Sequence, residues 1–240
     1  MAHSHSARDR NHLLATLSAD DAAALEARGE PVALTLRLVM EAANKPIKHV
    51  CFPFSGIVSV VASGPKDRKI EVGLVGSEGM SGISIILGDD RSPNDTFVQV
   101  AGAGLRLGVA DLRELMQQRP AIRQHFLRYA HAFMTQSAHT ALANGRAKVE
   151  ERLARWLLMA HDRIEGDELA LTHEFLSIML GVRRAGVTTA LNLLEARALI
   201  QLERGRIRVL GRAGLQALAN GIYGIPEAEY RRLLGWGGKS

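Results

Sequence analysis

One short segment carries side chains that can bond to the phosphates and base edges of a DNA major groove. They share one side of a helix predicted to begin near residue 183, namely Arg183, Arg184, Ala185, Thr188, Thr189 and Asn192. Arg184 can bond to the O6 and N7 atoms of a guanine together, whereas alanine can pack on a thymine methyl group and threonine can bond to bases or phosphates. The opposite side carries Val187, Leu191 and Leu194 at helical spacing. The pattern predicts an amphipathic helix with a buried face and a DNA-reading face.

A shorter helix is predicted directly before this one, beginning at Thr172. Threonine is a good N-cap, and Glu174 lies in the first turn, where the helix dipole favours an acidic side chain. Gly181 is expected to end the helix and to form a tight turn. Two helices joined in this way form a helix-turn-helix, although an ordinary basic surface helix would show the same pattern in this window alone.

The residues after the second helix predict a short hairpin with Gly205 at its tip, which is typical of a winged helix. Arginines are concentrated here, at Arg197, Arg204, Arg206, Arg208 and Arg212. Only two acidic residues lie between positions 183 and 212, and this imbalance favours a polyanionic partner over an ordinary solvated surface. Further contacts to DNA, mainly to its phosphates, are expected from Thr172, His173, Lys148, Arg204 and Arg206.

Composition and charge are compatible with such a protein. The chain has 240 residues, of which 47% are hydrophobic and 23% charged, enough for two modest globular domains. Its formal net charge of +5 suits nucleic acid without proving it. No apolar run approaches the roughly 18 residues of a membrane-spanning helix, and the N-terminus lacks the apolar stretch of a secretory signal. A cytoplasmic protein that does not enter a membrane is therefore expected.

Changes in periodicity divide the chain and predict an α+β fold. Up to about residue 109, short alternating segments such as Ile70–Leu74 and Phe97–Val100 are separated by frequent glycines, which favours a small barrel, roll or sandwich. We expect a sensor domain over 1–119, a dimerisation helix and hinge over 120–145, and the DNA-binding domain over 146–240. No repeat or low-complexity segment is present.

The long helix predicted after Pro120 carries large side chains at steps of four and three. These are Ile122, Phe126, Tyr129 and Phe133, followed by polar Gln136 and Thr140. Such spacing is typical of a coiled-coil seam, and a dimer would set two recognition helices about 34 Å apart on successive major grooves. The alternative is that this face packs on its own β domain. Asn144–Gly145 is the expected break and hinge.

This order of a glycine-rich β region, a long helix, a hinge and a winged helix resembles the Crp/Fnr family of bacterial transcription regulators. The resemblance extends from about Leu13 to Ala219 and is strongest over Thr172–Ile200, in the cap, in Gly181 and in Arg184. It implies a cyclic-nucleotide-binding-like β roll, a homodimer that binds a palindromic site, and an effector in the roll. RNA polymerase is a further partner that we expect.

The resemblance also implies where an effector would bind. Gly76–Gly79 matches the glycine–glutamate turn of the family's ligand cassette, and the expected pocket residues are Glu78, Gly79, Arg91, Ser92 and Asn94. Relatives that bind cyclic nucleotides place an arginine four residues before a strand valine. In this chain Arg91 precedes Val98 by seven, and Asn94 and Asp95 stand at the places expected for the arginine–serine pair. The site thereby loses a cation and gains a carboxylate, so a cyclic nucleotide is not expected.

Other cofactors are constrained by the single cysteine. Cys51 alone cannot hold an iron–sulfur cluster within one chain, and His49 and Cys51 are isolated candidates for a haem ligand, so haem is not expected. No metal site is expected, because His125, His131 and His139 lack the spacing that aims two imidazoles at one ion.

No constellation for catalysis is present. The chain has no nucleophile elbow, no Walker motif and no dinucleotide-binding glycine motif, so an enzyme is not expected. The sequence predicts a DNA-binding transcription regulator controlled by an unidentified effector. The alternative is a ligand-sensing or scaffold protein that acts through protein contacts and binds no DNA.

Overall fold

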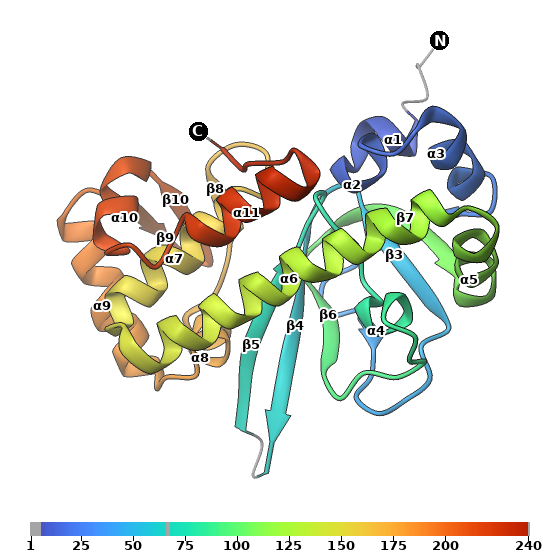
Figure 1. Ribbon diagram of the computed structural model, residues 1–240. Coiled ribbons are helices and arrows are strands. Elements are labelled where there is room, and N and C mark those ends of the chain that lie inside the picture. Colours follow the sequence, from blue (N-terminus) through green and yellow to red (C-terminus); the bar gives the residue numbers. More distant parts are fainter. Residues whose placement is uncertain (1–5, 66–67, 240) are drawn as a thin grey trace.

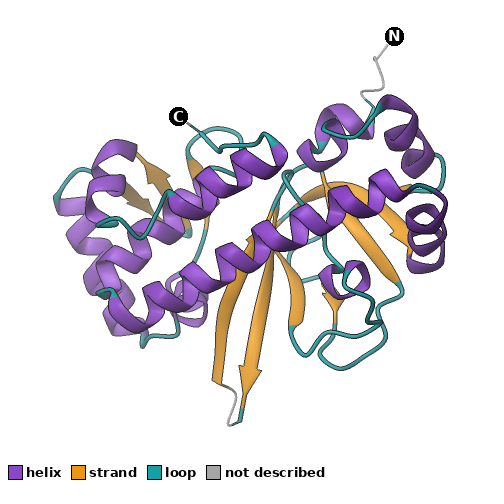
Figure 2. Ribbon diagram, in the orientation of Figure 1, coloured by secondary structure: helices purple, strands orange, loops and turns teal. Residues whose placement is uncertain are grey.

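A single long helix passes both the β-rich N-terminal part and the mainly helical C-terminal part of the chain (Figures 1 and 2). The computed structural model describes residues 6–65 and 68–239. Its helices are α1 (Ala7–Arg10), α2 (His12–Ala15), α3 (Ala19–Glu26), α4 (Ile83–Ile86), α5 (Val109–Gln118), α6 (Pro120–Arg146), α7 (Val149–His161), α8 (His173–Leu180), α9 (Arg184–Ala196), α10 (Arg212–Leu218) and α11 (Ile225–Leu234).

Two antiparallel sheets form the β domain. Their strands are β1 (Glu30–Leu34), β2 (Val39–Glu41), β3 (His49–Pro53), β4 (Ile57–Gly64), β5 (Arg68–Val75), β6 (Asp95–Val100) and β7 (Gly102–Gly108). One sheet has the order β1-β7-β3 and the other β2-β6-β4-β5, so most neighbours are distant in sequence. The predicted α+β architecture is confirmed, and the alternating segments named above lie within β5 and β6.

Close approach of the backbone explains some of the glycines in this domain. Gly56 has a φ of +84°, and a Cβ at this position would lie 2.4 Å from the carbonyl oxygen of Val100. A side chain is excluded there by both conformation and space. The turn between β3 and β4 therefore requires glycine.

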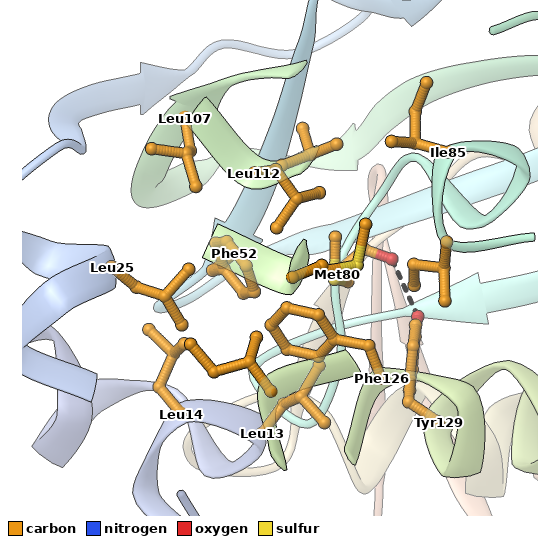
Figure 3. Close-up of a cluster of buried hydrophobic side chains, with 14 of the residues drawn as sticks. Leu13, Leu14, Leu25, Phe52, Met80, Ile85, Leu107, Leu112, Phe126 and Tyr129 are labelled. Atoms are coloured by element: carbon orange, nitrogen blue, oxygen red, sulfur yellow. Dashed lines mark hydrogen bonds between the residues drawn. The ribbon is translucent and has the colours of Figure 1, made fainter. Parts of the chain in front are cut away.

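The long helix α6 packs its large side chains on its own β domain. Phe126 is fully buried with its ring centroid 5.8 Å from that of Phe52, and the Tyr129 hydroxyl donates to the carbonyl of Met80 at 2.7 Å (Figure 3). Ile122 and Phe133 are buried as well. The prediction of a dimer seam at Ile122, Phe126, Tyr129 and Phe133 is therefore wrong, because these side chains are already covered within one chain.

The polar end of the same face is also occupied. Gln136 is buried, and its side-chain amide accepts from the backbone N–H of Leu74 at 2.7 Å and donates to its carbonyl at 3.3 Å. These bonds attach α6 to β5. Side-chain spacing reveals which face of a helix is apolar, but it does not say which surface that face meets.

The break after α6 lies later than predicted. The helix continues through Asn144 and Gly145 and ends at Arg146, with the N–H of Ala147 still bonded to the carbonyl of Ala143. Lys148 then caps α7, and its N–H donates to Glu151 at 2.9 Å. A glycine inside a helix costs only about 1 kcal/mol, which twenty-six other helical residues outweigh here. The connection is therefore at Ala147.

The C-terminal part contains the predicted winged helix and a segment that leaves it. Strands β8 (Glu168–Ala170), β9 (Ile200–Glu203) and β10 (Arg206–Val209) form a small antiparallel sheet beside α7 to α10. After α10 the chain returns to α6, and α11 lies along it (Figure 1). The span 146–240 is thus not one packing unit. Within the described residues, no helix combines the length and the apolar character needed to cross a membrane.

Candidate DNA-binding interface

The helix-turn-helix forms where the sequence predicts it. The Thr172 hydroxyl accepts from the N–H of Phe175 at 3.2 Å and so caps α8. Gly181 ends that helix with a φ of +61°, a left-handed conformation that glycine adopts without strain. The following N–H, of Val182, bonds back to the carbonyl of Ser177 at 3.0 Å and closes the turn. The turn thereby fixes the direction in which α9 leaves.

Helix α9 has the two faces that its sequence predicts. Val187, Leu191 and Leu194 are fully buried in the core of the C-terminal part. The side chains on the opposite face are exposed, and these are Arg183, Arg184, Ala185, Thr189 and Asn192. Of these, Arg183 precedes the helix as its N-cap. No part of the described chain covers the predicted reading face.

Thr188 and His173 have a different environment from the other predicted contacts. Thr188 is half-buried, and its hydroxyl donates to the carbonyl of Arg184 at 3.1 Å. The same hydroxyl lies 3.1 Å from Nδ1 of His173 at the start of α8. The contact between His173 and Thr188 connects the two helices, so both residues help to position α9, and part of their hydrogen-bonding capacity is already used within the chain.

The structure gathers predicted contact residues from three elements around one hollow. A cavity of about 210 Å³ is lined by Thr172 and His173 of the α8 start, by Arg184 of α9, and by Gly205 and Arg206 of the wing. Arg184 and Arg206 lie about 20 residues apart in sequence and share this surface. The arginine predicted to read base edges and the arginine predicted to contact phosphates therefore line the same hollow.

The other arginines in and after the wing differ in how far their guanidinium groups are exposed and in whether they already form ion pairs. Arg204 is exposed, and Arg206 is exposed with its guanidinium 3.6 Å from Glu168. Arg208 forms a closer ion pair with the same carboxylate. Arg212 is mostly buried and pairs with Asp162 at 2.6 Å, so it belongs to the core of the domain. Lys148 is exposed at the start of α7 and does not line the hollow.

The expected effector residues are not all brought together. Glu78 is buried in an ion pair with Arg163, and a Cβ on Gly79 would lie 2.6 Å from the Tyr129 hydroxyl. Arg91 is exposed and pairs with Asp90 at 3.5 Å. These three residues are therefore not among those that line the hollow of Ser92 and Asn94, and their assignment to an effector site stays a prediction.

The two other expected residues, Ser92 and Asn94, do line a hollow of about 120 Å³ between the roll and α6. Its polar lining also includes Glu41, whose carboxylate accepts from the N–H of Gly82 at 2.7 Å. Burial raises the pKa of Glu41. No lysine or arginine lines this hollow, and it is smaller than the roughly 300–1,000 Å³ of most ligand pockets. Such a lining disfavours a phosphate.

Cys51 and His49 lie at another hollow, of about 140 Å³, together with apolar side chains of β1 and β2. Cys51 is buried, and burial raises the pKa of its thiol to about 12. A thiolate is the form that binds metals and reacts, so this environment opposes both roles. His49 is exposed.

A buried carboxyl joins the β domain to the C-terminal part. Glu71 of β5 accepts from the indole N–H of Trp156 on α7 at 2.7 Å and from the Ser59 hydroxyl at 2.7 Å. Burial raises the pKa of Glu71 to about 7, against the opposing effects of these two bonds and of Arg163 and Arg155. The folded chain therefore binds a proton that the unfolded chain releases at lower pH.

This difference predicts that stability falls as pH rises. The contribution is complete below the ordinary pKa of 4.5 and is lost as pH passes through about 7, which amounts to about 3 kcal/mol in total. Between pH 5 and pH 8, the free energy of unfolding in urea should therefore fall by about 2.5 kcal/mol more for the wild type than for Glu71→Gln. Glu174→Gln, at an exposed position, is the matched control. Equal pH dependence in all three proteins would contradict the assignment.

Comparison with known proteins agrees with this geometry. Residues 151–218 match the model of the Crp-like helix-turn-helix domain. No curated protein sequence matches the chain significantly.

Solved structures share the fold over most of the chain. A transcriptional regulator of the Crp/Fnr family from Eubacterium rectale has a TM-score of 0.68 and 16% identity, covering 87% of this chain and 98% of its own. FixK2 from Bradyrhizobium japonicum has a TM-score of 0.68 and 15% identity, with 79% and 96% covered. The c-di-GMP responsive regulator CLP from Xanthomonas campestris has a TM-score of 0.65 and 17% identity, with 81% and 100% covered.

Proposed function

We propose that the chain is a Crp/Fnr-type transcription regulator, and not an enzyme, that binds a palindromic DNA site as a homodimer. The match of residues 151–218 to the Crp-like helix-turn-helix domain and the fold shared with Crp/Fnr structures support this proposal. The observation that carries the proposal is the exposed face of α9, with Arg184 beside Thr172 and Arg206 at one hollow. In this account α9 enters the major groove, and the wing follows the adjacent backbone.

The contacts divide into two kinds. Arg184 reads a guanine, while Ala185 and Thr189 contact neighbouring bases. Arg183, Arg204, Arg206 and the exposed start of α8 at Thr172 bond to phosphates and hold the helix in register. This division rests on exposure and position, since the base-reading residues lie on the first two turns of α9 and the others flank it.

The test is a mobility shift with genomic DNA fragments at two salt concentrations. Phosphate contacts release counterions, so with about six contacts the affinity should fall by about three orders of magnitude between roughly 50 and 200 mM salt. A protein that acts through protein contacts alone, as a ligand sensor or scaffold, would show no shift even at low salt. That result would favour the alternative function and end the present proposal.

A dimer needs a contact surface other than the predicted seam, because the side chains of that seam are buried within one chain. The open face of α6 carries Leu127, Met134 and Ala141 at steps of seven, and Met134 is 59% exposed. Leu142, 49% exposed, extends this apolar surface. We propose that the α6 of a second copy covers this face. The support is the heptad spacing along a 27-residue helix whose opposite face packs on the β domain.

An effector would act through the hollow that contacts this helix. Phe133 of α6 lines the small cavity together with Ser92 and Asn94, so a molecule bound there would touch α6 directly. We propose that it shifts the population of two orientations of the DNA-binding domain. The Xanthomonas relative responds to c-di-GMP, but a hollow that contains the Glu41 carboxyl and no basic residue does not favour an anion. RNA polymerase as a partner and a cytoplasmic location remain predictions from the sequence.

Mass spectrometry of the purified protein under native conditions tests for such an effector. A small molecule that co-purifies should be neutral or cationic, and it should slow hydrogen exchange around Phe133. A bound nucleotide, or an effector without influence on α6, would contradict this part of the proposal.

A further inference from the structure

We propose that the C-terminal segment from Ile225 to Lys239 is a strap that holds the DNA-binding domain on the β domain, locked by the ion pair of Glu78 and Arg163. The strap lies beyond the region that matches the helix-turn-helix model, which ends at residue 218. It leaves the winged helix and runs back along α6 (Figure 1). This inference concerns domain orientation and does not depend on DNA binding.

The lock is a buried ion pair between the two domains. Glu78 belongs to the turn after β5, and Arg163 follows α7. The guanidinium Nε lies 2.8 Å from the carboxylate, and each side chain is 2% exposed. Both groups make a further bond, since Glu78 also accepts from the N–H of Gly76 at 3.0 Å and Nη1 of Arg163 donates to the carbonyl of Met159 at 2.6 Å. Separating the domains would break this ion pair, and removing one partner with the domains still in contact would leave the other charge buried and unpaired.

The strap covers this lock with aromatic side chains. The Tyr230 hydroxyl donates to the carbonyl of Glu78. The Tyr230 ring packs edge to face with Trp236 at 5.4 Å and with Tyr129 of α6 at 6.3 Å. The Trp236 ring lies 5.4 Å from the guanidinium carbon of Arg163. The strap is therefore in contact with the β domain, with α6 and with the lock at the same time.

The end of the strap is attached to the DNA-binding domain. The N–H of Lys239 donates to Asp162 at 3.0 Å, and Arg212 donates to the Lys239 carbonyl at 2.7 Å. Arg212 also pairs with Asp162. With Tyr230 fixed to the β domain and Lys239 to the other part, rotation about Ala147 must break one of these attachments. The strap thus sets the resting orientation of the DNA-binding domain.

The experiment measures the distance between spin labels on the two domains of one full chain without DNA, with the labelled protein mixed into an excess of unlabelled protein so that distances between two labelled chains do not contribute. Lys45→Cys and Gln216→Cys place labels at exposed positions, while native Cys51 is buried. Glu78→Gln with Arg163→Met removes the lock without leaving a buried charge. Tyr230→Ala with Trp236→Ala loosens the strap. The matched control is Arg232→Ala, whose guanidinium pairs with Glu229 on the exposed side of the same helix.

The wild type and the control should give one narrow distance distribution. Both double variants should give a distribution broader by about twofold or more, with a second population. Narrow distributions in both would overturn the proposal.

A milder variant covers the case in which the double variants fail to fold. Tyr230→Phe removes one hydrogen bond and keeps the ring. It should raise hydrogen exchange at Ala147, Lys148 and along α11 by about fivefold, the equivalent of one net hydrogen bond. Unchanged exchange at these positions would overturn the proposal on its own.

Discussion

Arg184→Ala should remove the preference of the protein for its own DNA site while leaving binding to random DNA nearly unchanged. Arg184 is exposed at the first position of α9, where a helix enters the major groove. Loss of a bidentate contact to guanine costs about 1–3 kcal/mol per half-site, a factor of roughly 5 to 150. Competition between a specific and a random duplex, each at the same salt concentration, measures the ratio.

Arg206→Ala is the companion variant. Its guanidinium is exposed on the wing, so its loss should lower the affinity for specific and for random DNA by the same factor. The salt dependence of binding should fall by about one released counterion. If the two variants lose affinity alike on both duplexes, the division between base reading and phosphate contact is wrong.

Met134→Glu combined with Leu127→Glu should convert the protein to monomers. Both side chains are exposed on α6, and in a two-fold seam each acidic residue would face apolar or like-charged neighbours. Because a monomer presents one recognition helix, affinity for a palindromic site should fall by at least about 100-fold. Sedimentation velocity and a mobility shift measure the two effects.

Gln216→Glu adds the same charge at an exposed position on α10, away from α6, and should leave the dimer intact. A second control uses the buried face: Phe126→Leu alters packing within one chain and should reduce stability without producing monomers. A dimer that persists in the double acidic variant would remove α6 as the dimer surface.

The DNA-binding helices could be predicted in detail because their signals are local. A threonine cap, a left-handed glycine and apolar residues three and four apart lie within about 25 positions, and each acts through its own backbone. The wing follows from a glycine between two short segments in which apolar and polar residues alternate. These features depend on residues close in sequence and not on contacts with distant parts of the chain.

The surface that α6 contacts could not be predicted in this way. The step pattern of Ile122, Phe126 and Tyr129 identified an apolar face correctly, and both a dimer and a β domain would satisfy it. In the structure this face of α6 packs on the β domain. The proposed dimer face at Leu127 and Met134 has weaker apolar character, because it includes His131 and Ala138, so its spacing is a weaker signal in the sequence.

The strap depends on contacts between remote parts of the chain. The hydrogen bond between Tyr230 and Glu78 joins residues 152 positions apart in the sequence, and the bond between Arg163 and Glu78 joins residues 85 positions apart. The sequence contains one signal that could have indicated it, since Tyr230 and Trp236 are large aromatic residues in a segment that follows a complete winged helix. Where such residues pack cannot be read from spacing alone.

Selection of bound duplexes from a random pool tests the central claim most directly. If two copies present α9 to successive major grooves, the wild type should enrich an inverted repeat whose half-site centres lie about 10 base pairs apart, with a guanine in each half. Arg184→Ala should lose that guanine. Absence of any enriched sequence, or enrichment of the same sequence by Arg184→Ala, would contradict the account.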